Sequence, residues 1–141
     1  MKSNIKLFRK KLKAQATSLN EIIIVIAIVG VLSTAGYMGY TKFIAKAKST
    51  EAQTLLRMLH TAEKSYFFEN NKYSSDFNEI GFEANKTTKE GGKGNYTIEI
   101  INASEDKFIA KATAIKDFDS DGAINVWEID QDGNLIEKVK D

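Results

Sequence analysis

The chain has 141 residues, with 20 basic and 19 acidic side chains, no cysteine and no proline. This length leaves room for one globular domain beside a membrane segment, and the lack of cysteine excludes a fold held by disulfides. Residues 1–16 carry six basic and no acidic side chains, so 14 basic ones remain in residues 17–141 against all 19 acids, a net charge of about −5. An acidic region of this size gives no electrostatic basis for binding nucleic acid.

An uncharged run of nineteen residues, 22–40, lies directly after Glu21. As a helix at about 1.5 Å per residue it would span roughly 28 Å, close to the hydrocarbon thickness of a bilayer. The basic residues before it predict that residues 1–16 stay in the cytoplasm and that the rest of the chain is exported. A carboxylate at the edge of an apolar helix is costly, so we expect Glu21 to have a specific role.

The sequence around Glu21 resembles the leader of type IV pilins and pseudopilins. In that family a short basic leader ends in a small residue, and an apolar helix follows with glutamate at its fifth position. The family pattern is matched at Leu19, Glu21, Ala27, Ile28 and Leu32. Aligned on Glu21, the leader is residues 1–16. The chain departs from the usual residues at Ala16 (usually glycine), Thr17 (usually phenylalanine) and Asn20 (usually apolar).

This resemblance implies that a prepilin peptidase cleaves after Ala16 and methylates the new amine of Thr17. It implies a single-pass protein of the inner membrane, which the pilus assembly machinery then builds into an extracellular filament with copies of itself or other pilins. Glu21 would pair with the N-terminal amine of a neighbouring subunit. The alternative is an ordinary secretory signal, cut after the apolar run near residues 33–36.

Residues 17–40 are predicted to be the membrane and assembly half of one helix, and residues 41–70 its amphipathic half. The apolar positions of the second half recur at steps of three, four and seven, which is typical of one helical face. They are Ala45, Ala52, Leu55, Leu59, Ala62 and Tyr66. His60, the only histidine, has no second ligand at coordination spacing and is predicted to be an ordinary surface residue. The aromatic cluster that closes the helix is predicted to be core: Tyr66, Phe67, Phe68 and Tyr73.

Residues 71–141 are predicted to form a loop and an antiparallel sheet. Four strand-like runs cover residues 96–100, 108–115, 124–130 and 135–139. Asp132 and Gly133 favour a two-residue hairpin turn between the last two runs, and the glycine-rich residues 89–95 are predicted to be mobile. One face of the second run carries three alanines, which would let a helix approach closely: Ala110, Ala112 and Ala114. The predicted fold is α+β, a long helix packed on a four-stranded antiparallel sheet, and the resemblance implies the same.

Residues 117–128 fit the pattern of a twelve-residue calcium loop, with acids at positions 1, 3 and 5, glycine at 6 and glutamate at 12. Glu128 falls within a predicted strand, about 16 Å from Ala123 at about 3.3 Å per residue, so it cannot close the coordination shell. One interpretation is a calcium site built from Asp117, Asp119 and Asp121 plus backbone carbonyls. The other is an acidic turn without a metal.

No pairing of nucleophile and base stands out, so the chain is not predicted to be an enzyme, and calcium is the one cofactor considered. Three functions remain. The first is a structural subunit of a type IV pilus. The second is a pseudopilin of a type II secretion or DNA-uptake system, with a periplasmic fibre. The third is a membrane-anchored calcium-binding module that never assembles. No nucleic-acid partner is predicted.

Overall fold

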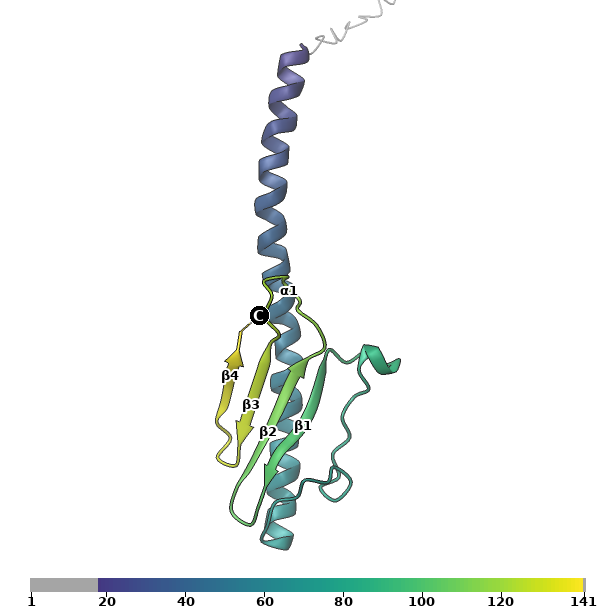
Figure 1. Ribbon diagram of the computed structural model, residues 1–141, viewed down its shortest axis with the longest axis vertical. Coiled ribbons are helices and arrows are strands. Elements are labelled where there is room, and N and C mark those ends of the chain that lie inside the picture. The colour runs from purple at the N-terminus through teal and green to yellow at the C-terminus, as the bar shows by residue number, and fades with distance from the viewer. Residues whose placement is uncertain (1–17, 141) are drawn as a thin grey trace, which may run out of the picture. The chain divides into compact units, whose positions relative to one another are not determined.

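The computed structural model describes residues 18–140. It contains one long helix, a short 3-10 helix and four strands (Figure 1): α1 (Leu19–Asn70), η1 (Thr88–Glu90), β1 (Tyr96–Ala103), β2 (Phe108–Ala114), β3 (Val126–Asp130) and β4 (Leu135–Val139). The predicted α+β fold is confirmed. The chain divides into two compact units, one that ends at Ala35 and one that begins at Gly36.

The described part of the first unit is the beginning of α1. The helix begins at Leu19 because Ser18 caps it: the Ser18 carbonyl accepts the amides of Glu21 and Ile22, and the Ser18 Oγ accepts the amide of Glu21 at 3.3 Å. Among the described residues, α1 is the one helix long and apolar enough to cross a membrane, with a mean hydropathy of 2.2 over its most apolar window.

The second unit holds the sheet, in the order β1-β2-β3-β4 with every neighbouring pair antiparallel. The later turns of α1 lie across one face of this sheet (Figure 1). The three alanines of β2 are buried on that face, as predicted, and their short side chains let the helix backbone approach.

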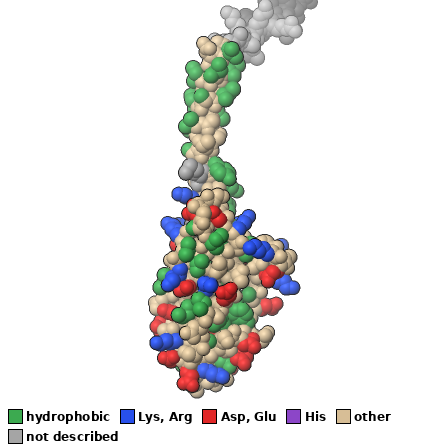
Figure 2. Space-filling view, viewed as in Figure 1, with side chains coloured by type: hydrophobic (Ala, Val, Ile, Leu, Met, Phe, Trp, Pro, Cys, Tyr) green, Lys and Arg blue, Asp and Glu red, His purple; other side chains and the backbone are tan. Residues whose placement is uncertain are grey.

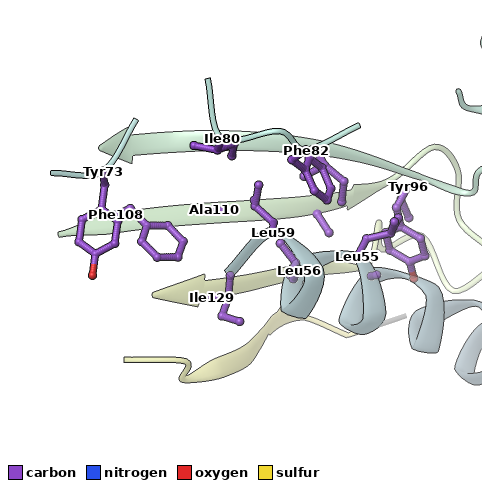
Figure 3. Close-up of a cluster of buried hydrophobic side chains, with 14 residues drawn as sticks. Leu55, Leu56, Leu59, Tyr73, Ile80, Phe82, Tyr96, Phe108, Ala110 and Ile129 are labelled. Atoms are coloured by element: carbon purple, nitrogen blue, oxygen red, sulfur yellow. The ribbon is translucent and has the colours of Figure 1, made fainter. Parts of the chain in front are cut away.

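The hydrophobic core of the second unit lies between α1 and the sheet (Figure 3). α1 contributes Leu55, Leu56 and Leu59, and the segment after the helix contributes Ile80 and Phe82. The sheet supplies Tyr96, Ile98, Phe108 and Ile129 besides the alanines. Each of these residues is less than 9% exposed, so the segment between helix and sheet is part of the core.

The predicted aromatic core is confirmed for Tyr73 and, partly buried, for Tyr66 and Phe67, whereas the predictions for Phe68 and His60 are wrong. Phe68 is 81% exposed, because the helix turns it away from the sheet while Phe67 stacks on Tyr73 at 4.7 Å between ring centroids. His60 is half-buried rather than free on the surface. Its Nε2 lies 3.2 Å from the Gln131 carbonyl oxygen, so it joins α1 to the β3–β4 turn.

The β3–β4 turn also differs from the predicted two-residue hairpin. The Gly133 amide donates to the Asp130 carbonyl at 3.0 Å, and Gly133 has a φ of 82° whereas Asp132 does not have a positive φ. The Asp130 carboxylate accepts the amides of Asp132 and Asn134. The turn is therefore one residue longer, with glycine at the left-handed position that follows a β-turn.

The glycine-rich loop forms a hydrogen-bonded turn where mobility was predicted. At η1, the Glu90 Oε2 accepts the amide and the hydroxyl of Thr87 at 2.9 and 2.8 Å, and the amide of Gly92 donates to the Thr87 carbonyl at 2.8 Å. Asn95 then donates from its backbone and side-chain nitrogens to the two carboxylate oxygens of Glu51, at 2.8 and 2.7 Å. These bonds fix both the loop and its junction with β1 to the helix.

Candidate functional site

The first candidate site is the apolar beginning of α1. Figure 2 shows apolar side chains along this part of the helix, and large ones are widely exposed, for example Val31 at 70% and Leu32 at 65%. Exposed apolar surface costs roughly 25 cal/mol per Å² relative to burial, and a continuous patch marks a contact with lipid or protein.

Glu21 lies in the first turn of this helix and is exposed. Within the described residues it forms no salt bridge, since the two ion pairs found there are Lys111 with Glu99 and Lys138 with Glu128. Its carboxylate is therefore available to a partner outside the described chain. The predicted cleavage residues Ala16 and Thr17 lie outside the described residues.

The second candidate site is the turn between β2 and β3. Asp117, Asp119 and Asp121 each present a carboxylate oxygen, and these oxygens lie within 4.8 Å of one another. The chain folds around Asp117, whose carboxylate accepts the amides of Asp119 at 3.1 Å and Gly122 at 2.8 Å. Ser120 has a φ of 66° and Gly122 of 94°, so the three predicted residues do converge.

Backbone amides of the turn donate hydrogen bonds to its acidic side chains. Asp119 Oδ1 accepts the amide of Asp121 at 3.1 Å, and Asp121 Oδ1 accepts that of Ala123 at 2.7 Å. Backbone N–H groups thus offset part of the negative charge. The arrangement suits both the acidic turn and the calcium site, because one oxygen of each of the three carboxylates lies within 4.8 Å of the other two.

Glu128 takes no part in this cluster, as predicted. It lies on β3 opposite Ile136, and its Oε2 is 3.2 Å from the Lys138 Nζ. Asp119 and Asp121 instead share a groove with three basic side chains: Lys42, Lys46 and Lys140. Nearby cations lower the repulsion among the acids whether or not a metal binds.

Three side chains that make buried or long-range contacts belong to no recognised sequence motif. Asn125 is buried beside the acidic turn, Glu51 holds the loop before β1, and Glu63 is buried under the segment after the helix. The signal for Glu63 was its spacing, since it follows the apolar Leu59 by four residues and so falls on the buried face of the helix.

Comparison with known proteins places the chain in a family. Residues 39–122 match the family described as Type IV minor pilin ComP, DNA uptake sequence receptor. A relative, the type IV major pilin protein PilA of Myxococcus xanthus (strain DK1622), is 42% identical over 74 residues. That match covers 52% of this chain but only 34% of the relative, so the chain spans about a third of that protein's length. Since the family match covers more than half of the chain, the protein belongs to the type IV pilin family.

Proposed function

We propose that the protein is a structural subunit of a type IV pilus, assembled through the first half of α1. The observation that carries this proposal is the exposed, uncharged helix of residues 22–40 with Glu21 at its start. Lipid of the inner membrane covers this surface before assembly, and the same helix of neighbouring subunits covers it in the filament.

Glu21 then sets the position of each subunit along its neighbour. A carboxylate within a bilayer costs about 2.5–3.5 kcal/mol on insertion scales, and the described residues offer it no ion pair. After cleavage behind Ala16, the new amine of Thr17 on an adjacent subunit supplies the missing cation. Peptidase processing is therefore a condition of assembly.

The test is Glu21→Ala in the full chain. We expect the variant to be inserted and processed, yet to be absent from filaments sheared from the cell surface and detected by immunoblot. Glu69→Ala, which removes an exposed acid near the other end of the same helix, is the matched control and should assemble normally. Filaments of normal amount and composition from Glu21→Ala would refute the pairing.

Processing has its own measurement. Mass spectrometry of the exported protein should give a chain that starts at a methylated Thr17. A chain that starts at Met1, or near residue 35, would show that the family peptidase does not cut here.

A pseudopilin of a type II secretion or DNA-uptake system shares every feature above but forms a periplasmic fibre. An antibody against residues 74–95 distinguishes the two, since much of this segment is exposed. Labelled surface filaments support the pilus, and periplasmic label alone supports the pseudopilin.

The family description also names a DNA receptor. We expect no such role for this chain, because residues 17–141 hold 14 basic against 19 acidic side chains and binding to DNA depends on cationic contacts with phosphate. A gel-shift assay with residues 42–141 at low salt tests this. A salt-sensitive shift at micromolar protein would establish DNA binding.

We also propose that the acidic turn binds calcium, on the observation that three carboxylate oxygens lie within 4.8 Å of one another. Calcium at about 100 times its dissociation constant would add about 2.7 kcal/mol to the free energy of unfolding. The melting temperature of residues 42–141 should therefore be several degrees higher in the presence of calcium than in the presence of a chelator. Asp119→Ala should abolish the rise and Asp106→Ala, in the exposed β1–β2 turn, should keep it. If the unaltered fragment has the same melting temperature with calcium and with chelator, the turn does not bind the metal.

The third function, an anchored calcium module that never assembles, differs in one respect. It predicts that the protein keeps its leader and that Glu21→Ala changes nothing. The two tests above decide against it if Thr17 is the N-terminus and filaments depend on Glu21.

A further inference from the structure

Glu63 is a buried acid for which the pilus role gives no use. It lies on α1 with its side chain fully buried. Its Oε2 accepts the backbone amide of Ser74 at 3.2 Å. Its Oε1 is buried and has no hydrogen-bond partner among the described residues. An acid with one satisfied and one unsatisfied oxygen inside a core is rare enough to need a physical reason.

The groups that face Glu63 do not neutralise it. On its own helix these are Lys64, whose Nζ lies 3.4 Å from the Tyr73 hydroxyl oxygen, and Tyr66, whose hydroxyl donates to Glu79 at 3.2 Å. The segment after the helix adds a second acid, Glu79. In the described chain Glu63 itself forms no ion pair.

The sheet supplies apolar surface on the other side of this segment. Phe108 of β2 packs against the Tyr73 ring, with 5.0 Å between their centroids. The pKa of the Tyr66 phenol is raised by burial, by the neighbouring Glu79 and by the negative charge of Glu63. Apart from Lys64, whose ammonium lies beside the Tyr73 hydroxyl, the groups around Glu63 are apolar or, like Glu79, acidic, and both disfavour an ionised carboxylate.

The protonated acid fits this site better than the carboxylate. Burial raises the pKa of Glu63, and the amide of Ser74 offsets only part of this effect. As a neutral acid, Glu63 can carry its proton on Oε1 and keep Oε2 free to accept the Ser74 amide. As an anion, it leaves a charged oxygen in the core without a donor, and the ways to solvate that oxygen are to admit water or to open the site.

Ser74 links Glu63 to the rest of the segment after the helix, so loss of its bond to Glu63 would loosen that segment. Its amide bonds Glu63, and its hydroxyl donates to Glu79 and accepts the amide of Asp76. The same segment carries Ile80 and Phe82 into the core (Figure 3). We infer that Glu63 is a proton-dependent latch, which holds residues 73–82 on α1 when it is protonated and loosens them when it is ionised.

The direction of the pH dependence follows from linkage. The ordinary pKa of this carboxyl is 4.5 and the folded-state pKa is raised, so above pH 4.5 the folded state binds more protons at Glu63 than the unfolded chain does. Its contribution to stability is fully present below pH 4.5 and is lost as the pH rises through the folded-state pKa. The segment is held more tightly in acid than at neutral pH.

The experiment is hydrogen exchange followed by mass spectrometry on the full-length protein in detergent micelles, from pH 4.5 to 8. Rates are corrected for the intrinsic pH dependence of exchange, and peptides within residues 73–82 are compared with peptides of β2. We expect the protection of residues 73–82 to fall with pH, by at most about tenfold per pH unit between the two pKa values. In Glu63→Gln, which keeps the shape of the side chain and cannot ionise, the protection of residues 73–82 should not change with pH.

Glu79→Gln is the matched control, because it removes the neighbouring acid but leaves Glu63. Its protection should be lower at every pH and should still fall as the pH rises. If circular dichroism shows that Glu63→Gln does not fold, Glu63→Met, which is of similar size and apolar, takes its place. An equal slope in the unaltered protein and the Glu63 variant, or protection that rises with pH, overturns the latch.

Discussion

Asn125 shows how one buried residue fixes the end of the chain. It is 1% exposed. Its Oδ1 accepts the Tyr96 hydroxyl at 2.8 Å, and its Nδ2 donates to Glu137 at 2.8 Å and to the Val139 carbonyl at 3.0 Å. One amide therefore joins β1 and β4 across the sheet, in a chain that has no cysteine for a disulfide.

Asn125→Ala should lower the free energy of unfolding by about 2–3 kcal/mol, because a buried polar group left without its partner costs about 1–3 kcal/mol and the Tyr96 hydroxyl is itself buried. Urea unfolding of residues 42–141 measures the change. Asn102→Ala, at an exposed position of β1, should stay within about 0.5 kcal/mol of the unaltered fragment. A similarly small effect at Asn125 would show that its hydrogen bonds contribute no net stability.

Single residues were predictable from sequence where a local motif identifies them. Glu21 stands out by its place before an uncharged run, and the three aspartates by their spacing of two. Asn125 and Glu63 have partners 29 and 11 residues away, and only the folded chain brings these together. Phe67 and Phe68 are adjacent and alike, so the helix phase alone decides that Phe67 packs against the core and Phe68 does not.

At the scale of elements, periodicity predicted correctly which segments are helix and which are strand, and predicted their first and last residues less well. The four strands and the single helix follow from alternation and from the three-and-four spacing. β1, however, runs on to Ala103 through a register shift between Ile100 and Asn102, because pairing with β2 continues after the alternation stops. The turn before β4 depends on the Asp130 carboxylate, which accepts two backbone amides, and a dipeptide pattern does not contain that information.

The close contact between α1 and the sheet gives the prediction for this scale. Ala112 is fully buried, pairs with Ile98 and Trp127 and belongs to the core cluster with the leucines of the helix. Ala112→Leu should lower the free energy of unfolding by about 1–3 kcal/mol, because overpacking forces side chains or backbone to shift.

Thr113→Leu is its control, since Thr113 is the next residue of β2 and points to the other face of the sheet. It should change the free energy of unfolding by less than about 0.5 kcal/mol. Equal losses from both variants would mean that β2 tolerates leucine on neither face, and the contact with α1 would not be the cause.

At the scale of the whole molecule, charge and hydropathy distinguish the apolar first half of α1, which is long enough to cross a membrane, from the more polar residues that follow it. The sequence predicts one helix through residues 17–70, and this is confirmed, since α1 runs from Leu19 to Asn70 although three glycines lie in its apolar half. The helix is nevertheless continuous there, and the positions where side chains could be added at Gly30, Gly36 and Gly39 are open space within the described chain.

These glycines give the last prediction. Each weakens a helix by about 1 kcal/mol relative to alanine, so we expect α1 to loosen first at residues 30–39 when subunits pack into the proposed filament. Gly30→Ala, Gly36→Ala and Gly39→Ala together fit without a clash and stiffen the helix. We expect the triple variant to be inserted and processed normally but to yield fewer filaments, measured by shearing and immunoblot against the membrane pool. Ala35→Gly, which softens the same segment, should assemble like the unaltered protein. A filament map with an unbroken helix through residues 30–40, or normal filaments from the triple variant, would show that assembly needs no such loosening.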